Sequence, residues 1–238
     1  MTGAADPAGP PDARGAPGDD TPAASSAPGR GAAEPRRPGV AAFDFDGTLA
    51  HRDTLVPFLR HACGTPRVLA AAARAALRSL DRDHLKVAAI GHLFRGRSVA
   101  EVDELGRAYV PTIVDLLRPE MLDRVRWHRA EGHALVIVSA SLGVYLRPLA
   151  SHLGLDAALA VELVADADGA LTGAVVGELN TRGPEKVARL RRWTDDRFGA
   201  DAPFELWAYG DSAGDEELLA LADHPTWVGR RAGRATAG

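Results

Sequence analysis

The sequence predicts an α/β fold, in which a parallel sheet carries helices on both faces and a helical segment is inserted after the first strand. Strand and helix signals alternate from residue 40 to about 228, which is typical of a parallel sheet covered on both sides. Residues 54–120 have a helical pattern throughout, far longer than a crossover between two strands needs. An insertion at the carboxyl end of the first strand would cover the edge where parallel sheets bind ligands.

The individual elements follow from apolar runs and their boundary residues. Strands are expected over residues 40–45, 134–141, 204–212 and 225–229, and a hairpin over 159–177 with its turn at Asp168-Gly169. Helices are expected over residues 55–62, 66–80, 83–94, 98–117, 119–132, 142–154, 183–199 and 214–222. Asp81, Ser98 and Pro119 stand where helices should begin, and Gly132 where one should stop.

These elements divide the chain into a core, a cap and two tails. Residues 1–38 are mostly Ala, Gly, Pro and charged residues, with no Leu, Ile, Val or aromatic residue, and are expected to be disordered. Residues 39–53 and 121–232 are expected to form the core, and residues 54–120 a helical cap inserted in it. The end of the chain, 233–238, is expected to be disordered.

The amino-acid composition argues against several classes of protein. A formal net charge of -4 argues against a nucleic-acid partner, and no apolar run reaches the roughly 18 residues of a membrane span. One cysteine, Cys63, excludes an internal disulfide framework, and we expect a cytoplasmic protein. Of 28 basic residues only Lys86 and Lys186 are lysines, so each is a candidate for a site that needs a compact ammonium group.

Reactive side chains follow three of the expected strands. Because parallel strands of one sheet end at a common edge, neighbouring strands would bring these groups together. A further helix would add a cation in its first turn. The groups are Asp44 and Asp46 at the end of the first strand, Ser139 and Ser141 at the end of the second, Asp211 and Asp215 at the end of the third, and Lys186 in the helix.

This combination favours phosphate chemistry with magnesium. Clustered carboxylates repel one another and need a cation to stay ionised, and oxygen ligands suit Mg²⁺. Together with Lys186, the cation would attract a dianionic phosphate, whose oxygens Ser139, Thr48 and loop amides could hold. One carboxylate could accept the phosphoryl group while a second protonates the leaving oxygen. Gly47 permits the turn between them.

Four motifs resemble those of the haloacid dehalogenase (HAD) superfamily of phosphohydrolases. They are "DFDGTL" at 44–49, "VIVSAS" at 136–141, Lys186 in "GPEKV", and "GDSAGD" at 210–215. The resemblance implies a Rossmann-like core, and the helical insertion is similar to the type I cap of the phosphoserine-phosphatase-like subfamily IB. The matching segment runs from about residue 40 to 228.

The resemblance also implies residue roles. Asp44 would be the nucleophile that forms an aspartyl-phosphate, and Asp46 the general acid and base. Ser139 and Lys186 would hold the phosphoryl group, with Gly47, Thr48 and Ala140 beside it. Mg²⁺ would be held by Asp44, Asp211 and the backbone carbonyl of Asp46, with Asp215 completing or orienting the shell. Arg182 is an alternative cation for the third motif.

The substrate is expected to be a small to medium-sized phosphorylated metabolite, and two departures from the family pattern bear on its identity. Phosphoserine phosphatases carry a glutamate nine residues after the nucleophile, where this chain has Asp53, and a Gly-Gly pair where it has Ala140-Ser141. Arg52 and Arg60 are further candidates to face the leaving group. The alternatives are a phosphatase of phospholipid or lysophospholipid headgroups, and a non-catalytic phosphate-binding or receiver-like module.

Overall fold

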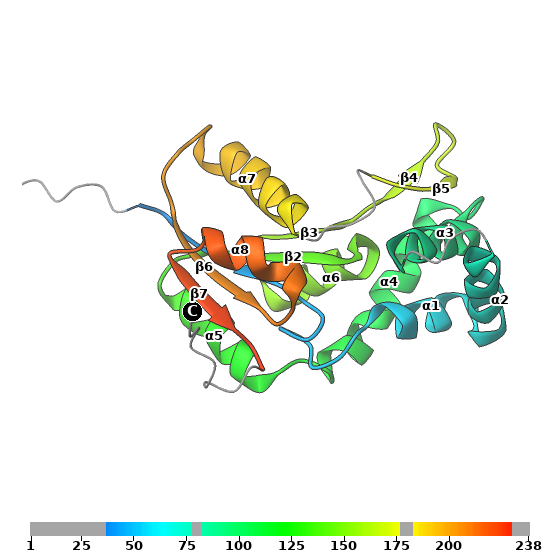
Figure 1. Ribbon diagram of the computed structural model, residues 1–238, viewed down its shortest axis with the longest axis horizontal. Coiled ribbons are helices and arrows are strands. Elements are labelled where there is room, and N and C mark those ends of the chain that lie inside the picture. Colours follow the sequence, from blue (N-terminus) through cyan, green and yellow to red (C-terminus); the bar gives the residue numbers. More distant parts are fainter. Residues whose placement is uncertain (1–36, 78–81, 177–182, 230–238) are drawn as a thin grey trace, which may run out of the picture. The chain divides into compact units, whose positions relative to one another are not determined.

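The computed structural model describes residues 37–77, 82–176 and 183–229 of the chain. A five-stranded, all-parallel sheet has the order β3-β2-β1-β6-β7 (Figure 1). Its strands are β1 (Gly39–Phe43), β2 (Ala134–Leu142), β3 (Ala157–Val161), β6 (Glu205–Gly210) and β7 (His224–Trp227). The first strand of the chain therefore lies at the centre of the sheet, between β2 and β6.

Each face of the sheet has its own apolar core. Ala41 and Phe43 of β1 pack into one cluster, while Val40 and Ala42 pack into another, because side chains alternate along a strand. The first cluster includes residues of α5 and α6, and the second includes residues of α7 and α8. These helices are α5 (Pro119–Ala130), α6 (Gly143–Leu153), α7 (Pro184–Phe198) and α8 (Glu216–Leu221). The predicted parallel sheet with helices on both faces is confirmed.

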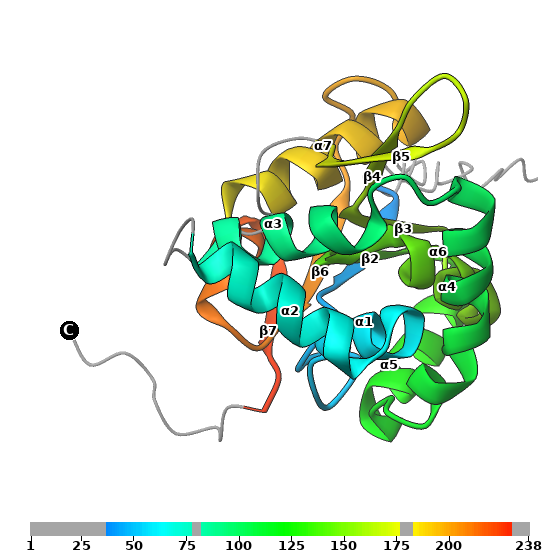
Figure 2. The same cartoon turned by 90° about the vertical axis from the view of Figure 1, so that its right-hand side faces the viewer.

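Four further helices follow the first strand and form the cap (Figure 2). They are α1 (Leu55–Cys63), α2 (Thr65–Ala76), α3 (Arg82–Phe94) and α4 (Val99–Val114). Phe58 of α1 links this helix to α3 and α4, since its ring lies 6.3 Å from that of Phe94 and 5.4 Å from that of Tyr109. The same ring lies 4.8 Å from that of Tyr145 in α6, so cap and core share one apolar cluster.

A short antiparallel hairpin accompanies the cap, although it comes later in the chain. Its strands are β4 (Leu163–Ala165) and β5 (Leu171–Val175). The turn forms where the sequence predicts, because the Asp166 carboxylate accepts hydrogen bonds from the amides of Asp168 (3.0 Å) and Ala170 (2.9 Å). The start of the predicted hairpin, residues 159–161, instead belongs to β3 at the edge of the main sheet.

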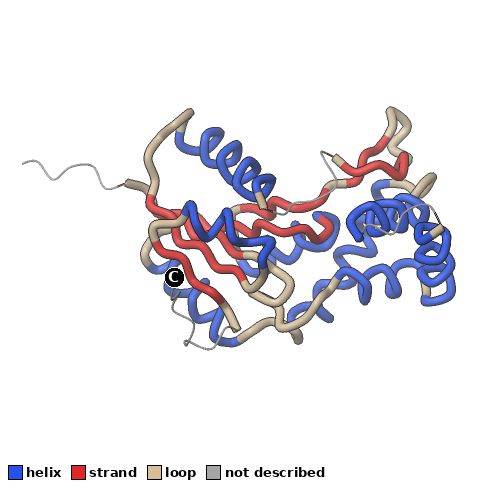
Figure 3. The backbone as a smooth tube through the Cα atoms, in the orientation of Figure 1, coloured by secondary structure: helices blue, strands red, loops and turns tan. Residues whose placement is uncertain are grey.

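The hairpin packs on the cap rather than on the sheet (Figure 3). Leu171 exchanges backbone hydrogen bonds with the loop between α3 and α4, accepting from Gly96 and donating to Arg97, both at 2.8 Å. The amide of Val99 donates to the carbonyl of Gly169 at 3.0 Å. Local sequence patterns carry no signal for this pairing, because it joins segments about 75 residues apart.

The helix boundaries match the signals that lie within the described residues. Ser98 accepts a hydrogen bond from the amide of Glu101 at 3.2 Å, and Pro119 is the first residue of α5. The helix α5 packs on the sheet, so the last cap helix ends at Val114. Residues 1–36 and 233–238, Asp81 and Arg182 lie outside the described residues. Within the described ranges, none of the helices combines the length and apolar character needed to cross a bilayer.

His128 of α5 makes fold stability depend on pH. Its side chain is fully buried, and its ring nitrogens lie 2.8 Å from the Tyr209 hydroxyl and from Nδ1 of His133. Burial, together with the neighbouring His133, lowers its pKa from 6.5 to about 4. Because the unfolded chain then binds the proton more tightly, stability should fall by about 3 kcal/mol as pH drops from 6.5 to 4.

Urea unfolding of His128→Phe and wild type across that pH window checks this prediction. The variant should lose less stability than wild type as the pH falls, whatever its stability at pH 7. Tyr209→Phe is the matched control, because it removes the hydroxyl partner and keeps the imidazole. Equal pH slopes for wild type and His128→Phe would contradict the prediction.

Candidate active site

The ends of β1, β2 and β6 bring the predicted acids to one edge of the sheet. Asp44 directly follows β1, and its amide donates to the carbonyl of Tyr209 in β6 at 2.9 Å. Asp211 directly follows β6, and Asp215 closes the short 3₁₀ turn Ala213–Asp215. Carboxylate oxygens of Asp44, Asp211 and Asp215 lie within 4.8 Å of one another. These three groups therefore form an acidic cluster.

Lys186 lies at the centre of this cluster. Its ammonium group donates to Asp44 and to Asp215, each at 2.5 Å, and all three side chains are buried. Burial favours the neutral amine, but the two carboxylates outweigh it and raise the pKa of Lys186. The lysine is therefore held in its charged form. Pro184 begins α7 and places Lys186 in its first turn, as the sequence predicts.

The carboxyl of Asp44 is less acidic than usual. Burial is the largest cause, the Asp215 charge adds to it, and Lys186 opposes it, so the pKa of Asp44 is about 6. Burial likewise raises the pKa of Asp211, again with a contribution from the Asp215 charge. Three carboxylates beside one lysine give this site more negative charge than Lys186 alone neutralises.

Asp215 holds the loop that carries Asp211. One of its oxygens accepts from the amides of Asp211 (3.2 Å) and Ser212 (3.0 Å) and from the Ser212 hydroxyl (2.9 Å). The other accepts from Lys186. Burial acts against ionisation, but Lys186 and these donors overcome it and lower the pKa of Asp215. Both of its oxygens are thus engaged within the protein.

Asp211 has an oxygen that suits a cation. Its Oδ1 is buried, and no hydrogen-bond donor within the described residues reaches it. A buried carboxylate oxygen without a donor is costly unless a ligand completes it. Gly47 lies against the same carboxylate with φ of 88°, and a Cβ there would come within 2.2 Å of Asp211 Oδ2. Glycine therefore serves both the turn and the close approach.

Asp46 is held apart from the acidic cluster by Thr54 and Ser141, two partners that the sequence did not indicate. Its Oδ1 accepts from the amide (2.8 Å) and the hydroxyl (2.7 Å) of Thr54, and its Oδ2 accepts from the Ser141 hydroxyl. Burial raises the pKa of Asp46 although these donors oppose the shift. The result is a fixed carboxyl whose proton is retained more readily than that of an ordinary aspartate.

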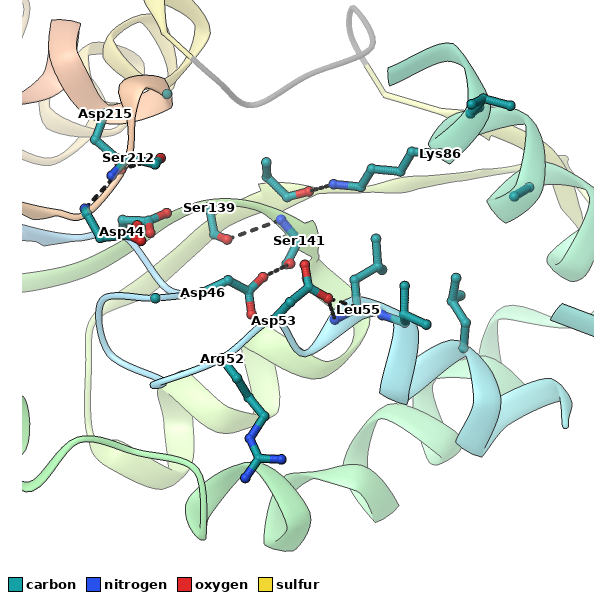
Figure 4. Close-up of a pocket in the computed structure, with 18 of the residues that line it drawn as sticks. Asp44, Asp46, Arg52, Asp53, Leu55, Lys86, Ser139, Ser141, Ser212 and Asp215 are labelled. Atoms are coloured by element: carbon teal, nitrogen blue, oxygen red, sulfur yellow. Dashed lines mark hydrogen bonds between the residues drawn. The ribbon is translucent and has the colours of Figure 1, made fainter. Parts of the chain in front are cut away.

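The acids and all the phosphate-binding candidates except Thr48 line one cavity of about 590 Å³ (Figure 4). Ser139 and Ala140 of β2 line it together with Gly47 and Lys186. Thr48 is fully buried, does not line the cavity, and has a hydroxyl with no partner in the described residues. Thr48 is therefore not among the residues that line the cavity, and its contact with phosphate stays a prediction.

Asp53 lines the cavity, but its carboxylate also has a local task. Its Oδ1 accepts from the amides of Leu55 (3.1 Å) and Val56 (3.4 Å) at the start of α1. Arg52 lines the cavity too, whereas Arg60 does not. In Figure 4 the Arg52 side chain points away from the labelled acids. Asp53 thus stabilises the first turn of the cap.

Ser141, Thr54 and Lys86 make contacts in the site that the sequence did not indicate. For Ser141, the spacing of two from Ser139 along an extended strand was the available signal. Lys86 of α3 donates to the carbonyl of Ala140, so a cap residue reaches the end of β2. The scarcity of lysine had marked Lys86 as a candidate, but it did not indicate which group the ammonium would contact.

Removal of the Ser141 hydroxyl should slow catalysis without unfolding the protein. In Ser141→Ala the Asp46 carboxyl keeps Thr54 but loses its second anchor, and if Asp46 is the general acid that the sequence predicts, its displacement should cost at least about tenfold in rate. Steady-state kinetics on an alkyl phosphate should therefore show a lower kcat and a nearly unchanged KM. Ser151→Ala, which removes an exposed hydroxyl from α6, is the matched control.

Known proteins resemble this chain in sequence and in structure. The family model for haloacid dehalogenase-like hydrolases matches residues 41–220. Protein CicA of Caulobacter vibrioides is 38% identical over 193 residues, which cover 78% of this chain and 84% of that protein.

Solved structures have the same fold at lower identity. A Bordetella pertussis protein of unknown function has a TM-score of 0.64 at 22% identity, covering 79% of this chain and 89% of its own. A phospho-aspartyl intermediate analogue of phosphoserine phosphatase has a TM-score of 0.53 at 22% identity, covering 79% and 84%. The family match includes all four motifs that form the cavity edge, and the chain belongs to the haloacid dehalogenase-like hydrolases.

Proposed function

We propose that the protein is a Mg²⁺-dependent phosphomonoester hydrolase that works through a covalent aspartyl-phosphate on Asp44. The observation that carries the proposal is the arrangement of two kinds of carboxyl on one cavity floor. Asp44 lies within the acidic cluster and contacts Lys186, whereas Asp46 is held separately by Thr54 and Ser141. One group is placed to attack phosphorus and the other to move protons.

The donor set fits magnesium. Asp44 and Asp211 would hold the ion with the backbone carbonyl of Asp46, and Asp215 would orient Asp211 through the loop amides. The buried Oδ1 of Asp211, which has no donor among the described residues, supports this assignment. When bound, Mg²⁺ supplies positive charge that neutralises the carboxylates and the phosphate oxygens.

The reaction takes two steps. In the first, a carboxylate oxygen of Asp44 forms a bond to phosphorus, the bond to the ester oxygen breaks, and the Asp46 proton passes to the leaving alcohol. In the second, Asp46 takes a proton from water, whose oxygen bonds to phosphorus while the Asp44–phosphorus bond breaks. Inorganic phosphate leaves, and both carboxyls return to their starting states.

Lys186 and Ser139 are proposed to hold the transferring phosphoryl group. Lys186 already touches Asp44, so its charge is available where negative charge gathers in the transition state. Ser139 is buried at the end of β2, where its hydroxyl accepts from the Ser141 amide at 3.1 Å and its own proton remains to donate. Ala140 and Gly47 also line the cavity beside these two residues.

The substrate is proposed to be a small or medium-sized phosphorylated metabolite in the cytoplasm. Phosphoserine, the substrate named for one structural relative, is disfavoured by Asp53 at the glutamate position and by its bonds to the amides of α1. A non-catalytic phosphate-binding or receiver-like module remains the alternative from another class, but the full set of acids and Lys186 argues for catalysis. A phosphatase of phospholipid headgroups is the alternative within the enzymes.

Turnover of an aryl phosphate by the full chain, with Mg²⁺ and with excess chelator, tests the proposal. We expect phosphate release with Mg²⁺, loss on chelation, and recovery on readdition of the ion. Uncatalysed monoester hydrolysis is so slow that even weak turnover is informative. Equal turnover with and without Mg²⁺ would overturn the metal assignment, and complete inactivity on aryl and alkyl esters would favour the binding module.

A further inference from the structure

The cavity has two chemically different ends. The floor carries the acids, Lys186 and Ser139, as described above. The opposite wall is contributed by α1, α2 and α3 of the cap, and among the described residues it is almost entirely apolar. Its apolar members are Leu55, Val56 and Leu59 of α1, Val68, Ala72 and Ala76 of α2, and Leu85 and Ala89 of α3.

This wall is a continuous surface. Val68, Ala72 and Ala76 recur every four residues, so they form one stripe along α2 that faces the cavity. In α1 and α3 the lining residues follow the same spacing, because Leu55 and Leu59, like Leu85 and Ala89, are four apart. The helices α1 and α2 pack on one another, as do α2 and α3 (Figure 2). Alanine at three of these positions leaves room that larger side chains would fill.

Three polar residues border this wall, and each already makes a contact within the protein. Oδ1 of Asp53 accepts from backbone amides of α1, and the Lys86 ammonium donates to the carbonyl of Ala140. Arg52 lies 3.4 Å from a His51 nitrogen and points away from the labelled acids (Figure 4). A polar alcohol such as an amino acid or sugar would lose hydrogen bonds to water on entering this end and find few replacements.

Val56 adds a second indication. Its side chain is 42% exposed although it lines the cavity, so apolar surface remains open to solvent where a leaving group would lie. Burial of such surface by an apolar chain is favourable in proportion to the area covered. The volume of about 590 Å³ is well within the range of pockets that enclose a ligand.

We propose that the substrate is a phosphate monoester of an alcohol with an apolar carbon chain, whose chain packs against α1, α2 and α3 while its phosphate meets Lys186 and Asp44. The inference rests on the proposed hydrolase function and names its substrate class. The chemistry recognised is a dianionic head joined to an apolar tail. A soluble alkyl or isoprenoid phosphate and a lipid phosphate share that chemistry.

A series of n-alkyl phosphates, from methyl to octyl, tests the proposal on the full chain with Mg²⁺. Each added methylene that is buried should raise kcat/KM by about three- to fourfold until the apolar end is filled. Phosphoserine, which has a short polar leaving group, should be a poor substrate beside butyl phosphate. Binding of octylphosphonate compared with methylphosphonate, by calorimetry, measures the same preference without turnover.

Ala72→Phe should fill the apolar end while sparing the chemistry. We expect at least about a tenfold loss of kcat/KM on octyl phosphate and little change on methyl phosphate. Ala73→Phe is the matched control, since Ala73 is the next residue of α2, is exposed, and does not line the cavity. Equal effects of the two variants would overturn the assignment of this wall.

The possible outcomes distinguish failure of the apolar substrate class from failure of the proposed hydrolase function. Hydrolysis of every ester with no dependence on chain length would overturn the apolar substrate class and leave the hydrolase intact. No hydrolysis, with tight binding of octylphosphonate, would overturn the catalytic proposal and support the apolar site. Turnover of phosphatidic acid in phosphatidylcholine vesicles would assign the tail to a lipid, whereas turnover of monomeric octyl phosphate alone would assign it to a soluble ester.

Discussion

Asp44→Asn should abolish hydrolysis, with a fall in kcat/KM of at least about 10⁴-fold on an aryl phosphate. The amide has almost the same shape as the carboxylate but is not a nucleophile, so no bond to phosphorus forms. The fold should persist, because Lys186 keeps its contact with Asp215 and one negative charge leaves a crowded cluster. Purified variant and wild type, compared for phosphate release, check the expectation.

The control for this variant is Asp168→Asn, the same substitution at the exposed tip of the hairpin. It should retain wild-type turnover. Intact-mass measurement after a rapid quench adds a second readout, since wild type should carry one phosphoryl group and Asp44→Asn none. Retention of full activity by Asp44→Asn would eliminate the covalent mechanism, whatever the metal dependence.

The sequence predicted the parts of the site that depend on local order along the chain. Asp44, Asp46 and Asp211 follow apolar runs, so their place at the end of strands required only the strand assignment. Lys186 was predicted from the proline before it and from the scarcity of lysine. That the three strands are neighbours was an assumption from topology, and the order β2-β1-β6 confirms it.

The parts that could not be predicted depend on contacts between distant segments. Ser141 reaches Asp46 across 95 residues, and Lys86 reaches the carbonyl of Ala140 across 54. The packing of the β4–β5 hairpin on the cap could not be predicted either. It depends on backbone hydrogen bonds to Gly96 and Arg97, which do not require a particular pattern of side chains. Side-chain direction at long range is set by packing, which periodicity does not encode.

Asp53 makes local hydrogen bonds that its position in the family pattern did not indicate. The spacing of Asp53 from Asp44 predicted a role in substrate recognition. Asp53 also lies two residues before Leu55, where α1 begins, and acids at such positions commonly accept hydrogen bonds from the free amides of the first helical turn. In the structure, Oδ1 of Asp53 accepts from the amides of Leu55 and Val56. Asp53 lines the cavity as well, so its role in substrate recognition stays a prediction beside that of the apolar residues of α1–α3.

Asp46→Asn should slow hydrolysis by an amount that depends on the leaving group. An alkyl alcohol needs a proton as it departs, so loss of the general acid should cost about 10² to 10⁴-fold on an alkyl phosphate. Nitrophenolate leaves without a proton, so formation of the aspartyl-phosphate from nitrophenyl phosphate should be much less affected. The asparagine can keep the geometry, since its carbonyl can accept from Thr54 and its amide can donate to the Ser141 hydroxyl.

The second step should then limit the variant on nitrophenyl phosphate, because Asp46 also activates the water that releases phosphate. Stopped-flow measurements should show a burst of nitrophenolate close to one per active site, followed by slow turnover, and the phosphorylated protein should accumulate. Asp44→Asn gives no burst, so the two variants separate attack on phosphorus from proton transfer. An equal loss on both esters without a burst would show that Asp46 only positions other groups, and the proton-transfer role would pass to a different residue of the cavity.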